Sequence, residues 1–285
     1  MAFLEKSLRL SGEVMIPYTA RLLDITMNNN AIPGDWKKAV VIPIYKGRDR
    51  SVVGNYRPDS LTSVVCKQLE HIIAGCLRQV WEISGWLYVG QHGFRPRYSC
   101  QKQVVTFCQD IADSVDEGVR TDEIIIDFSK TFDLVPHERL LTKIAATEVD
   151  LRVVVWVKES LLGRPQRVTV DGQLSEEVRV TSGVPQGSAL GPLLFLVHVT
   201  DIWRNVESNI WLIAVDCVIY RKIMVSSDDK LQMDQNRLRE WAVENEMKIN
   251  PCKSKAVNLT KDGVKERIMY YFGDQLTFKT RAYYI

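Results

Sequence analysis

The apolar positions in the first third of the chain pass from a helical period to a strand period. They recur at helical spacing across residues 4–29, which predicts one or two amphipathic helices. A Pro-Gly pair ends this pattern, and the short β-branched run 39–45 predicts a strand. The polar stretch 47–57 then predicts a loop, and the helical period returns over residues 61–81.

Helical and strand-like runs alternate through the middle of the chain. Helical spacing predicts helices over residues 99–118, 136–146 and 151–162. The isoleucine-rich run 123–128 predicts a buried strand. Residues 166–170 and 177–180 alternate between apolar and polar positions on either side of Asp171-Gly172, which predicts a hairpin.

An apolar segment and two further strand-like runs occupy the last third. Residues 189–199 are almost wholly apolar, which predicts a buried helix. Residues 210–214 and 217–223 predict two strands joined by a short tip, and residues 230–245 predict an amphipathic helix. The expected fold class is therefore α+β with a small antiparallel sheet.

The composition is that of an ordinary globular protein. The 285 residues are 46% hydrophobic and 25% charged, enough for one large domain or two small ones. A net charge of +2 permits nucleic-acid binding without arguing for it. The six cysteines form no C-x-x-C pair, which speaks against a zinc site or a disulfide framework. The early charges and the short apolar run 190–199 favour a soluble nuclear or cytoplasmic protein.

Asp127 is the first candidate for chemistry, because it follows three isoleucines in the predicted buried strand. Burying an acidic group is costly unless a partner offsets its charge, so a nearby cation or metal ion is one explanation. The alternative is an aspartate that only caps the next turn of the chain.

The second candidate is the glycine- and proline-rich stretch SGVPQGSALGPLLF, residues 182–195. Small residues such as Gly187 allow another backbone or a flat base to approach closely. The Gln186 amide offers both a donor and an acceptor to a base or sugar edge. The alternative is a glycine-rich connector without a binding role.

The third candidate is the predicted hairpin WLIAVDCVIY, residues 211–220, with Val215 and Asp216 expected at its tip. Two carboxylates at such a tip can hold a divalent metal ion, but a valine cannot coordinate one. Successive residues of a strand point to opposite faces, so a one-residue slip is expected to be needed before Asp216 could substitute for a carboxylate at position 215.

Seven motifs follow one another in a fixed order along most of the chain. They are PIYKGRDRSVVGNYRP, QHGFRPRYS, DFSKTFD, SGVPQGS, AVDC, NPCKSK and YYFG. Together they resemble the reverse transcriptases of jockey-like non-LTR retrotransposons, which are RNA-directed DNA polymerases. The resemblance implies right-hand polymerase fingers and palm, with a small antiparallel palm sheet packed on helices and the thumb missing. It divides the chain into a helical lead-in (1–35), fingers (36–120), a palm (121–273) and a truncated tail (274–285).

The resemblance also implies the metal-binding and catalytic residues. Asp127 and Asp216 would bind Mg²⁺ or Mn²⁺, and an intact site would hold two such ions for attack of a primer 3′-hydroxyl on a nucleoside triphosphate. Val215 stands where the family has a metal-binding aspartate, which implies a loss of about 4 kcal/mol, a thousandfold in rate. Lys253 resembles the lysine that approaches the pyrophosphate leaving group, with a solvated surface charge as the alternative.

Five positions resemble the nucleotide-binding residues of the family. Lys46 and Arg57 would neutralise the triphosphate, unless they are solvated loop charges. Phe132 resembles the bulky residue that excludes a ribose 2′-hydroxyl, or else it belongs only to the core. Gln186 and Gly187 resemble the residues that touch the template and the incoming nucleotide.

The partners implied are an RNA template, a DNA primer and deoxynucleoside triphosphates, without a membrane, and the oligomeric state stays open. Residues 271–273 resemble the start of a primer-gripping hairpin. Asp59 stands where the family usually has an aliphatic residue, and Thr200 where it commonly has asparagine. Arg97 and Glu148 stand where the family often has glycine, which implies strain if those residues need a positive φ.

Three functions follow from this reading. The first is a reverse transcriptase domain with impaired or absent activity. The second is a non-catalytic module that binds nucleic acid, and the third is the translated relic of a dead element. A group II intron-type maturase shares the fold, but no maturase region is expected after the palm.

Overall fold

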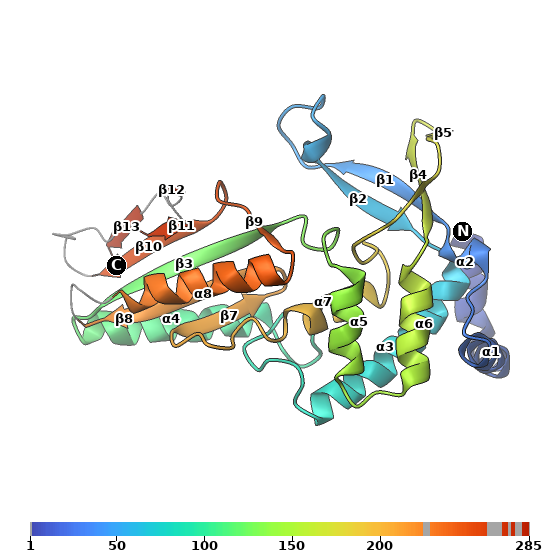
Figure 1. Cartoon of the computed structure of the whole chain (residues 1–285), viewed down its shortest axis with the longest axis horizontal. Coiled ribbons are helices and arrows are strands. Elements are labelled where there is room, and N and C mark those ends of the chain that lie inside the picture. Colours follow the sequence, from blue (N-terminus) through green and yellow to red (C-terminus); the bar gives the residue numbers. More distant parts are fainter. Residues whose placement is uncertain (1, 225–228, 261–269, 273–274, 277–280, 285) are drawn as a thin grey trace. The chain divides into compact units, whose positions relative to one another are not determined.

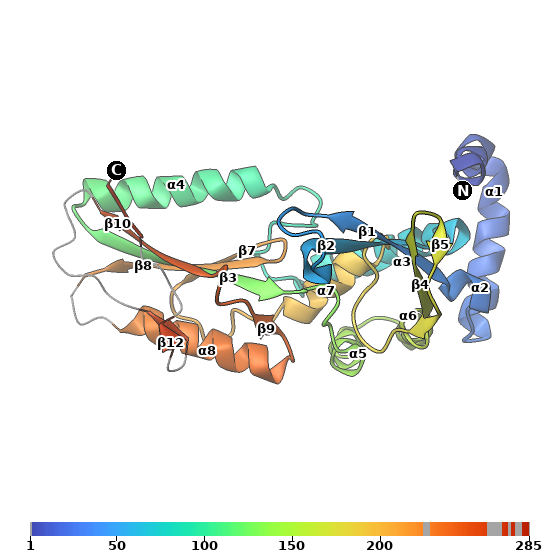
Figure 2. The ribbon, with the colours of Figure 1, turned by 90° about the horizontal axis from the view of Figure 1, so that it is seen from above.

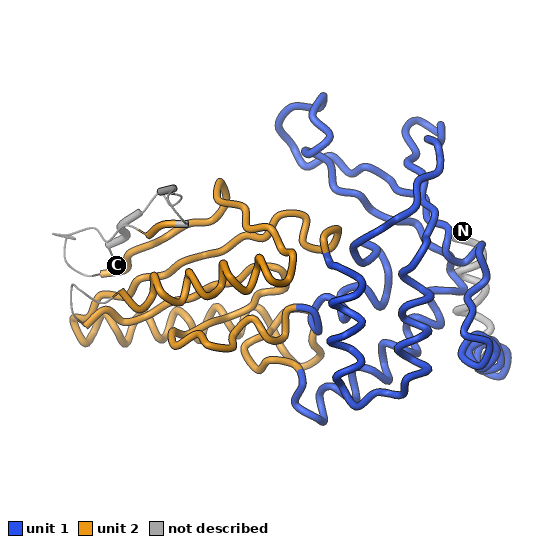
Figure 3. Tube along the Cα trace, in the orientation of Figure 1, with its two compact units in different colours: residues 1–86, 135–198 blue, residues 87–134, 199–285 orange. Residues whose placement is uncertain are grey.

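The computed structural model describes the backbone of residues 2–224, 229–260, 270–272, 275–276 and 281–284 (Figure 1). The chain forms two compact units, and each contains two separate stretches of sequence (Figure 3). Unit 1 contains residues 1–86 and 135–198, and unit 2 contains residues 87–134 and 199–285. The expected division of the chain into fingers, palm and tail stays a prediction.

Unit 1 combines helices with a five-stranded sheet. Its helices are α1 (Ala2–Asn28), α2 (Gly34–Lys37), η1 (Val53–Asn55, a 3-10 helix), α3 (Val64–Ile83), α5 (His137–Ala145), α6 (Leu151–Leu161) and α7 (Gly191–Val199). Its strands are β1 (Ala39–Tyr45), β2 (Tyr56–Leu61), β4 (Pro165–Val170), β5 (Gln173–Leu174) and β6 (Val178–Arg179). The strand order is β2-β1-β4-β5, with β6 also paired to β4. Strand β1 runs antiparallel to β2 and parallel to β4.

The apolar stripe of α3 supplies a large part of the core of unit 1. Leu69, Ile73, Leu77 and Trp81 follow one another at intervals of four residues, and each is at most 3% exposed. That interval places them on one face of the helix. The helix begins at Ser63, whose hydroxyl accepts a hydrogen bond from a backbone amide of the first turn at 3.4 Å.

Gly75 lies on the exposed side of α3, and we expect Gly75→Ala to stabilise the protein. A β-carbon there would meet no atom within 4 Å, and the residue already has helical backbone. Alanine should raise the free energy of unfolding by about 0.5–1 kcal/mol, measured by urea titration, because glycine loses more backbone freedom on folding. Gly85 is the matched control, since its surroundings are equally open but its φ is +67°. Gly85→Ala should therefore destabilise, and a gain at both positions would contradict the explanation.

Unit 2 is built on a six-stranded sheet that carries a helix on each face. The helices are α4 (Cys100–Asp116) and α8 (Lys230–Glu244), which Figure 2 shows on opposite faces. The strands are β3 (Arg120–Ser129), β7 (Asn209–Ile213), β8 (Asp216–Ile223), β9 (Lys248–Ile249), β10 (Lys255–Thr260), β11 (Tyr271–Phe272), β12 (Gln275–Leu276) and β13 (Arg281–Tyr284). The order is β13-β10-β3-β8-β7, with β9 also on β3, while β11 and β12 pair with each other.

Strand β3 lies at the centre of this sheet and presents two different faces. Ile124 and Ile126 are 0% exposed and Phe128 is 6% exposed, so this face belongs to the core. Glu123 and Asp127 alternate with them and are half-buried on the other face. Burial raises the pKa of the Glu123 carboxyl to about 7. The apolar face of β3 therefore anchors the strand in the core, and its other face can present Asp127 to a ligand.

Most elements predicted from the sequence are confirmed. The helices expected over 99–118, 136–146, 151–162, 189–199 and 230–245 correspond to α4, α5, α6, α7 and α8. The strands expected over 39–45 and 123–128 are β1 and β3, and the long N-terminal helix is α1, with non-helical backbone at Gly12. Among the described residues, none of the helices is long and apolar enough to cross a membrane.

One expectation about a strand was wrong, and one predicted hairpin contains an additional short strand. The sequence predicts a loop up to residue 57 and a helix from residue 61, but residues 56–61 form β2. Pro58 and Asp59 disfavour a strand, and only the pairing with β1 overrides that preference. The turn at Asp171-Gly172 is confirmed, with φ of 50° and 80°, but β4 pairs across it with the short strand β5. The stretch 177–180 forms β6, which also pairs antiparallel with β4, so the two predicted strands do lie side by side.

Candidate active site

Two aspartates from neighbouring strands form the centre of the candidate site. Asp127 on β3 and Asp216 on β8 are direct cross-strand partners in the antiparallel register. Residues in such a pair point to the same face, so the two carboxylates lie close together. Burial, and then the negative charge of Asp127, raise the pKa of the Asp216 carboxyl, while Lys253 lowers it. Two adjacent carboxylates of this kind attract a cation.

Lys253 carries a positive charge close to this pair. Its Nζ atom lies 3.7 Å from Asp127 Oδ2, and its side chain is 61% exposed. A turn after β9 positions it, because the Asn250 amide donates to the Asp127 carbonyl at 2.7 Å. The Ser254 hydroxyl accepts from the Asp127 amide at 3.2 Å in the same turn. The structure thus places Asp127, Asp216 and Lys253 close together.

The hairpin tip differs from its predicted form. Its two turn residues are Ala214 and Val215, and Asp216 is the first residue of β8. The expected tip of Val215 and Asp216 was therefore one residue too late. The expected need for a one-residue slip before Asp216 could replace a carboxylate at position 215 stays a prediction, while Asp216 itself shares the face of Asp127 in the observed register. Position 215 still carries a half-buried valine, which has no atom that can bind a metal ion.

The carboxylate pair fits one divalent cation. Magnesium takes one or two protein carboxylates and completes its octahedron with water and substrate phosphate. Asp127 Oδ1 is buried and has no hydrogen-bond partner within the described part of the chain, so a ligand position is available. No group of three or more His, Cys, Asp and Glu side chains in that part is arranged to hold a metal. Two carboxylates therefore suit one ion rather than a bridged pair.

A second group of predicted residues gathers in unit 1. The Arg57 guanidinium donates from Nε to Gln186 Oε1 at 3.2 Å, and the Ser60 amide donates to the Gln186 carbonyl at 2.9 Å. A β-carbon at Gly187 would lie 2.7 Å from the Ser60 carbonyl oxygen, and its φ is +93°. Only glycine suits this position, because both the backbone conformation and the contact with β2 exclude a side chain.

The sequence did not single out Glu70, which fixes this loop. Glu70 is 2% exposed, and its Oε2 atom accepts from the Ser188 hydroxyl at 2.6 Å and the Ala189 amide at 2.9 Å. The Ser188 hydroxyl in turn accepts from two backbone amides at the start of α7, both at 3.1 Å. One feature of the sequence could have revealed Glu70. It is an acidic residue on the apolar face of a predicted helix, and a buried acidic side chain requires a hydrogen-bond partner.

The remaining predicted residues are distributed over both units. Lys46 is exposed in unit 1, next to β1. Phe132 is half-buried in unit 2, where its ring packs edge-on against Phe94 at a centroid distance of 6.0 Å. Residues 271 and 272 form β11, whereas Gly273 lies outside the described residues.

The departures from the family pattern have different structural outcomes. Arg97 takes a φ of 68°, so the expected strain at that residue is present. Glu148 is not among the described residues with positive φ, so the condition for backbone strain at that residue is not met. Asp59 is half-buried on β2, and Thr200 is 9% exposed with its hydroxyl accepting from the Tyr88 amide at 3.1 Å.

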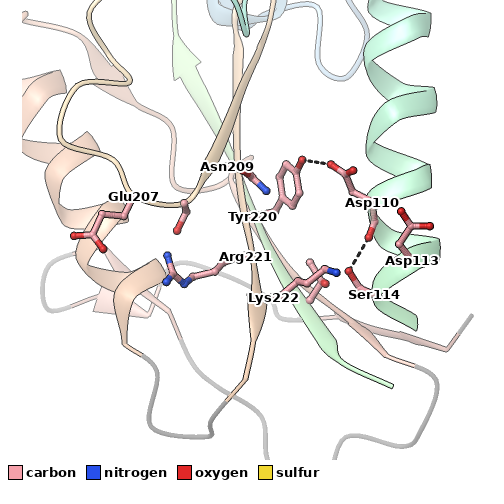
Figure 4. A pocket seen from close by; sticks show the side chains of 10 residues that line it. Asp110, Asp113, Ser114, Glu207, Asn209, Tyr220, Arg221 and Lys222 are labelled. Carbon is pink, nitrogen blue, oxygen red and sulfur yellow. Dashed lines mark hydrogen bonds between the residues drawn. The ribbon is translucent and has the colours of Figure 1, made fainter. Parts of the chain in front are cut away.

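A cavity of about 550 Å³ also lies in unit 2, between α4 and the ends of β7 and β8 (Figure 4). Figure 4 shows Tyr220 pointing towards Asp110, whose carboxylate accepts from its hydroxyl at 2.5 Å. Lys222, also in the lining, pairs with Glu117 at 2.6 Å. None of the residues predicted for the site lines this cavity, so it has no part in the candidate site.

The sheet of unit 2, with paired carboxylates on adjacent antiparallel strands, and the helical and sheet elements of unit 1 together define a right-hand polymerase fold. The telomerase of Candida tropicalis with a TWJ fragment of telomeric RNA is similar at a TM-score of 0.58 and 12% identity, over 87% of this chain and 45% of that one. The apo telomerase of that organism gives a TM-score of 0.57 and 13% identity, over 79% and 45%. At these identities the likeness establishes the fold alone.

The family follows from the sequence comparison. A family model described as "Reverse transcriptase (RNA-dependent DNA polymerase)" matches residues 44–276, and the chain belongs to this family. It is 31% identical over 253 residues to a probable RNA-directed DNA polymerase from transposon X-element of Drosophila melanogaster. It is 28% identical over 269 residues to the RNA-directed DNA polymerase from mobile element jockey of the same species.

These two alignments cover 84% and 90% of this chain but only 28% and 29% of the relatives. The chain therefore spans less than a third of the length of the curated relatives it matches. The resemblance to the reverse transcriptases of jockey-like non-LTR retrotransposons is confirmed.

Proposed function

We propose that this domain catalyses RNA-directed DNA synthesis for a mobile element, and that its active site is impaired in this chain. The observation that carries the proposal is the pair formed by Asp127 and Asp216 on neighbouring strands. Two partly exposed carboxylates side by side repel each other, so they contribute little to the stability of the sheet. Their arrangement is explained by a cation that both of them bind.

Three residues of unit 2 would act at the primer end. Asp127 and Asp216 would hold a divalent cation, which when bound supplies charge neutralisation at the reacting phosphate and activates the primer 3′-hydroxyl. Lys253 is exposed, so its ammonium group can turn to the leaving pyrophosphate. Phe132 would restrict the space beside the sugar and so favour deoxynucleotides.

The residues gathered in unit 1 would bind the nucleotide and the template. Arg57 and Lys46 are exposed and carry the positive charges that suit a triphosphate. Gln186 is held by Arg57 and by the β2 backbone, so its position is fixed before a ligand binds. Gly187 leaves the loop surface free of a side chain, which lets a base or sugar approach the backbone.

The direct test is primer extension on an RNA template with deoxynucleoside triphosphates and Mg²⁺ or Mn²⁺. The chain carrying Val215→Asp is compared with the same chain carrying Asp127→Ala as well. Product from the first and none from the second supports the proposed function. Equal product from both, or no product from either folded protein, contradicts it.

A non-catalytic nucleic-acid-binding function is the second candidate, because Val215 removes a metal ligand and leaves the exposed cations Lys46 and Arg57 unchanged. We expect the native chain to bind an RNA–DNA primer–template with an affinity that falls steeply as salt rises. Fluorescence anisotropy between 50 and 200 mM salt measures the slope, and Lys46→Ala with Arg57→Ala should reduce it by about two. If the affinity of the native chain does not change with salt, the binding function is contradicted, and the third function, the translated relic of a dead element, is the one that remains.

A further inference from the structure

The segment Gly90–Gly93, which contains the first three residues of the motif QHGFRPRYS, lies directly against the tip of the β7–β8 hairpin. The Leu212 amide donates to the Gly90 carbonyl at 3.0 Å, and the His92 amide donates to the Leu212 carbonyl at 3.1 Å. These two bonds form an isolated parallel bridge between Gln91 and Leu212. Leu212, two residues before the turn, is therefore hydrogen-bonded to this segment on one side of β7, while β8 lies on the other side.

Gly93 approaches the backbone of the turn more closely than any side chain would allow. A β-carbon at Gly93 would lie 2.3 Å from the Ala214 nitrogen and 2.4 Å from the Ala214 α-carbon. The obstacle is backbone, so it cannot rotate away as a flexible side chain could. Alanine at position 93 would have to displace the turn itself.

Gln91 holds the same turn from the side. Its side chain is 2% exposed, and its Nε2 atom donates to the carbonyls of Ala214 and Gly93, each at 3.3 Å. Ala214 has a φ of 58°, a conformation that costs a non-glycine residue about 1–2 kcal/mol. A strained turn residue persists where its surroundings impose it, and here Gln91 and Gly93 do so.

The segment Gly90–Gly93 and the residues before it are also bound by side chains outside the hairpin. Gln103 on α4 is 1% exposed and donates from Nε2 to the Gly90 carbonyl at 2.9 Å. The Arg95 guanidinium donates to the Tyr88 carbonyl at 2.7 Å and lies 3.8 Å from the Tyr98 ring centroid. The segment is therefore a fixed support rather than a mobile loop edge.

We infer that Gly90–Gly93 is a clamp that sets the direction of residues 215 and 216, and that Gln91 and Gly93 are positioning residues for the metal ligands. The inference rests on the proposed function for its catalytic meaning, but the clamp itself is a property of the fold. It gives a role to a motif that contains none of the residues predicted to bind metal or nucleotide. It also explains why position 93 requires glycine although its own φ is not positive.

The test uses Gln91→Glu and Gly93→Ala in the chain that carries Val215→Asp. Gln91→Glu keeps the size of the side chain but turns a donor into an acceptor that faces two carbonyls. The matched control is Gln235→Glu, since Gln235 is 0% exposed and its Nε2 atom donates to a backbone carbonyl far along the chain, that of Tyr271, at 3.1 Å. Both glutamines lie in unit 2, so general losses of stability should be alike.

Three measurements are compared. The affinity for Mn²⁺, followed by the electron paramagnetic resonance of free Mn²⁺, should fall about 10–100-fold in both clamp variants and stay within about twofold in the control. In primer extension, the clamp variants should lower kcat by a similar factor while KM for the nucleotide stays unchanged. Amide hydrogen exchange across residues 212–217 should be faster in the clamp variants than in the control.

Unchanged Mn²⁺ affinity and unchanged hydrogen exchange in folded Gln91→Glu would overturn the clamp. If Val215→Asp itself binds Mn²⁺ no better than the native chain, the account of Val215 in the proposed function fails. Hydrogen exchange then decides the clamp alone, in the native background. Faster exchange in Gln91→Glu than in Gln235→Glu supports the clamp, and equal exchange overturns it.

Discussion

Replacing Val215 by aspartate is expected to raise the rate of primer extension by about a thousandfold over the native chain. In the proposed site Asp127 and Asp216 would bind the cation, and Val215 adds no ligand to them. Val215 is half-buried and directly precedes Asp216 in the turn, and the resemblance to the family places a third metal-binding carboxylate at this position. The loss of a direct metal ligand costs more than the 10–100-fold that follows from weakening a residue behind it. The measurement is single-nucleotide extension on an RNA template under limiting Mg²⁺.

Val215→Asn is the matched control for this prediction. Asparagine has nearly the size and polarity of aspartate but lacks its charge, so it should recover little of the rate. A similar gain from Asn and Asp would show that the turn benefits from any polar side chain, and that charge at position 215 is unimportant. Extension by the native chain within about tenfold of the Val215→Asp variant would contradict the idea that valine disables the site.

The candidate site could be predicted largely because its members lie next to strong local patterns. Asp127 ends an isoleucine run, and Asp216 lies between two apolar runs, so the sequence alone brings each of them close to the end of a strand. The turn of the hairpin was predicted one residue too late, since a two-residue turn at Ala214 and Val215 depends on a positive φ that alanine does not signal. That conformation comes from contacts with Gln91 and Gly93, which lie more than a hundred residues away.

The same reason explains why β2 and the anchor of the glycine-rich loop were not predicted. The sequence YRPDSL has no apolar alternation, and it forms a strand only because β1 offers its edge. Glu70 lies 118 residues from the Ser188 hydroxyl that it binds, so no spacing along the chain reveals the pair. Local patterns determine which segments form elements, whereas the partners of buried polar groups depend on the complete fold.

Asp122 is a fully buried acidic residue of unit 2 that accepts several hydrogen bonds. It lies on β3 with 0% exposure, five residues before Asp127, and the sequence gives it no distinction from the acidic residues around it. The Arg120 guanidinium donates to it at 2.5 and 2.6 Å, the Asn258 amide at 2.7 Å and the Tyr270 hydroxyl at 2.6 Å. Asn258 and Tyr270 are themselves at most 1% exposed, so this carboxylate joins β3 to β10 and to the segment before β11.

We therefore expect Asp122→Ala to lower the free energy of unfolding by about 3–5 kcal/mol, because it removes a buried charged acceptor to which Asn258, Tyr270 and Arg120 all donate. Equilibrium urea unfolding followed by tryptophan fluorescence measures the loss. The control is Glu117→Ala, which removes a 2.6 Å ion pair with Lys222 whose side chains are 55% and 40% exposed. That exposed pair should contribute only about 0.2–1 kcal/mol. Equal losses from the two substitutions would mean that the buried network adds no more to the stability of unit 2 than a solvated ion pair does.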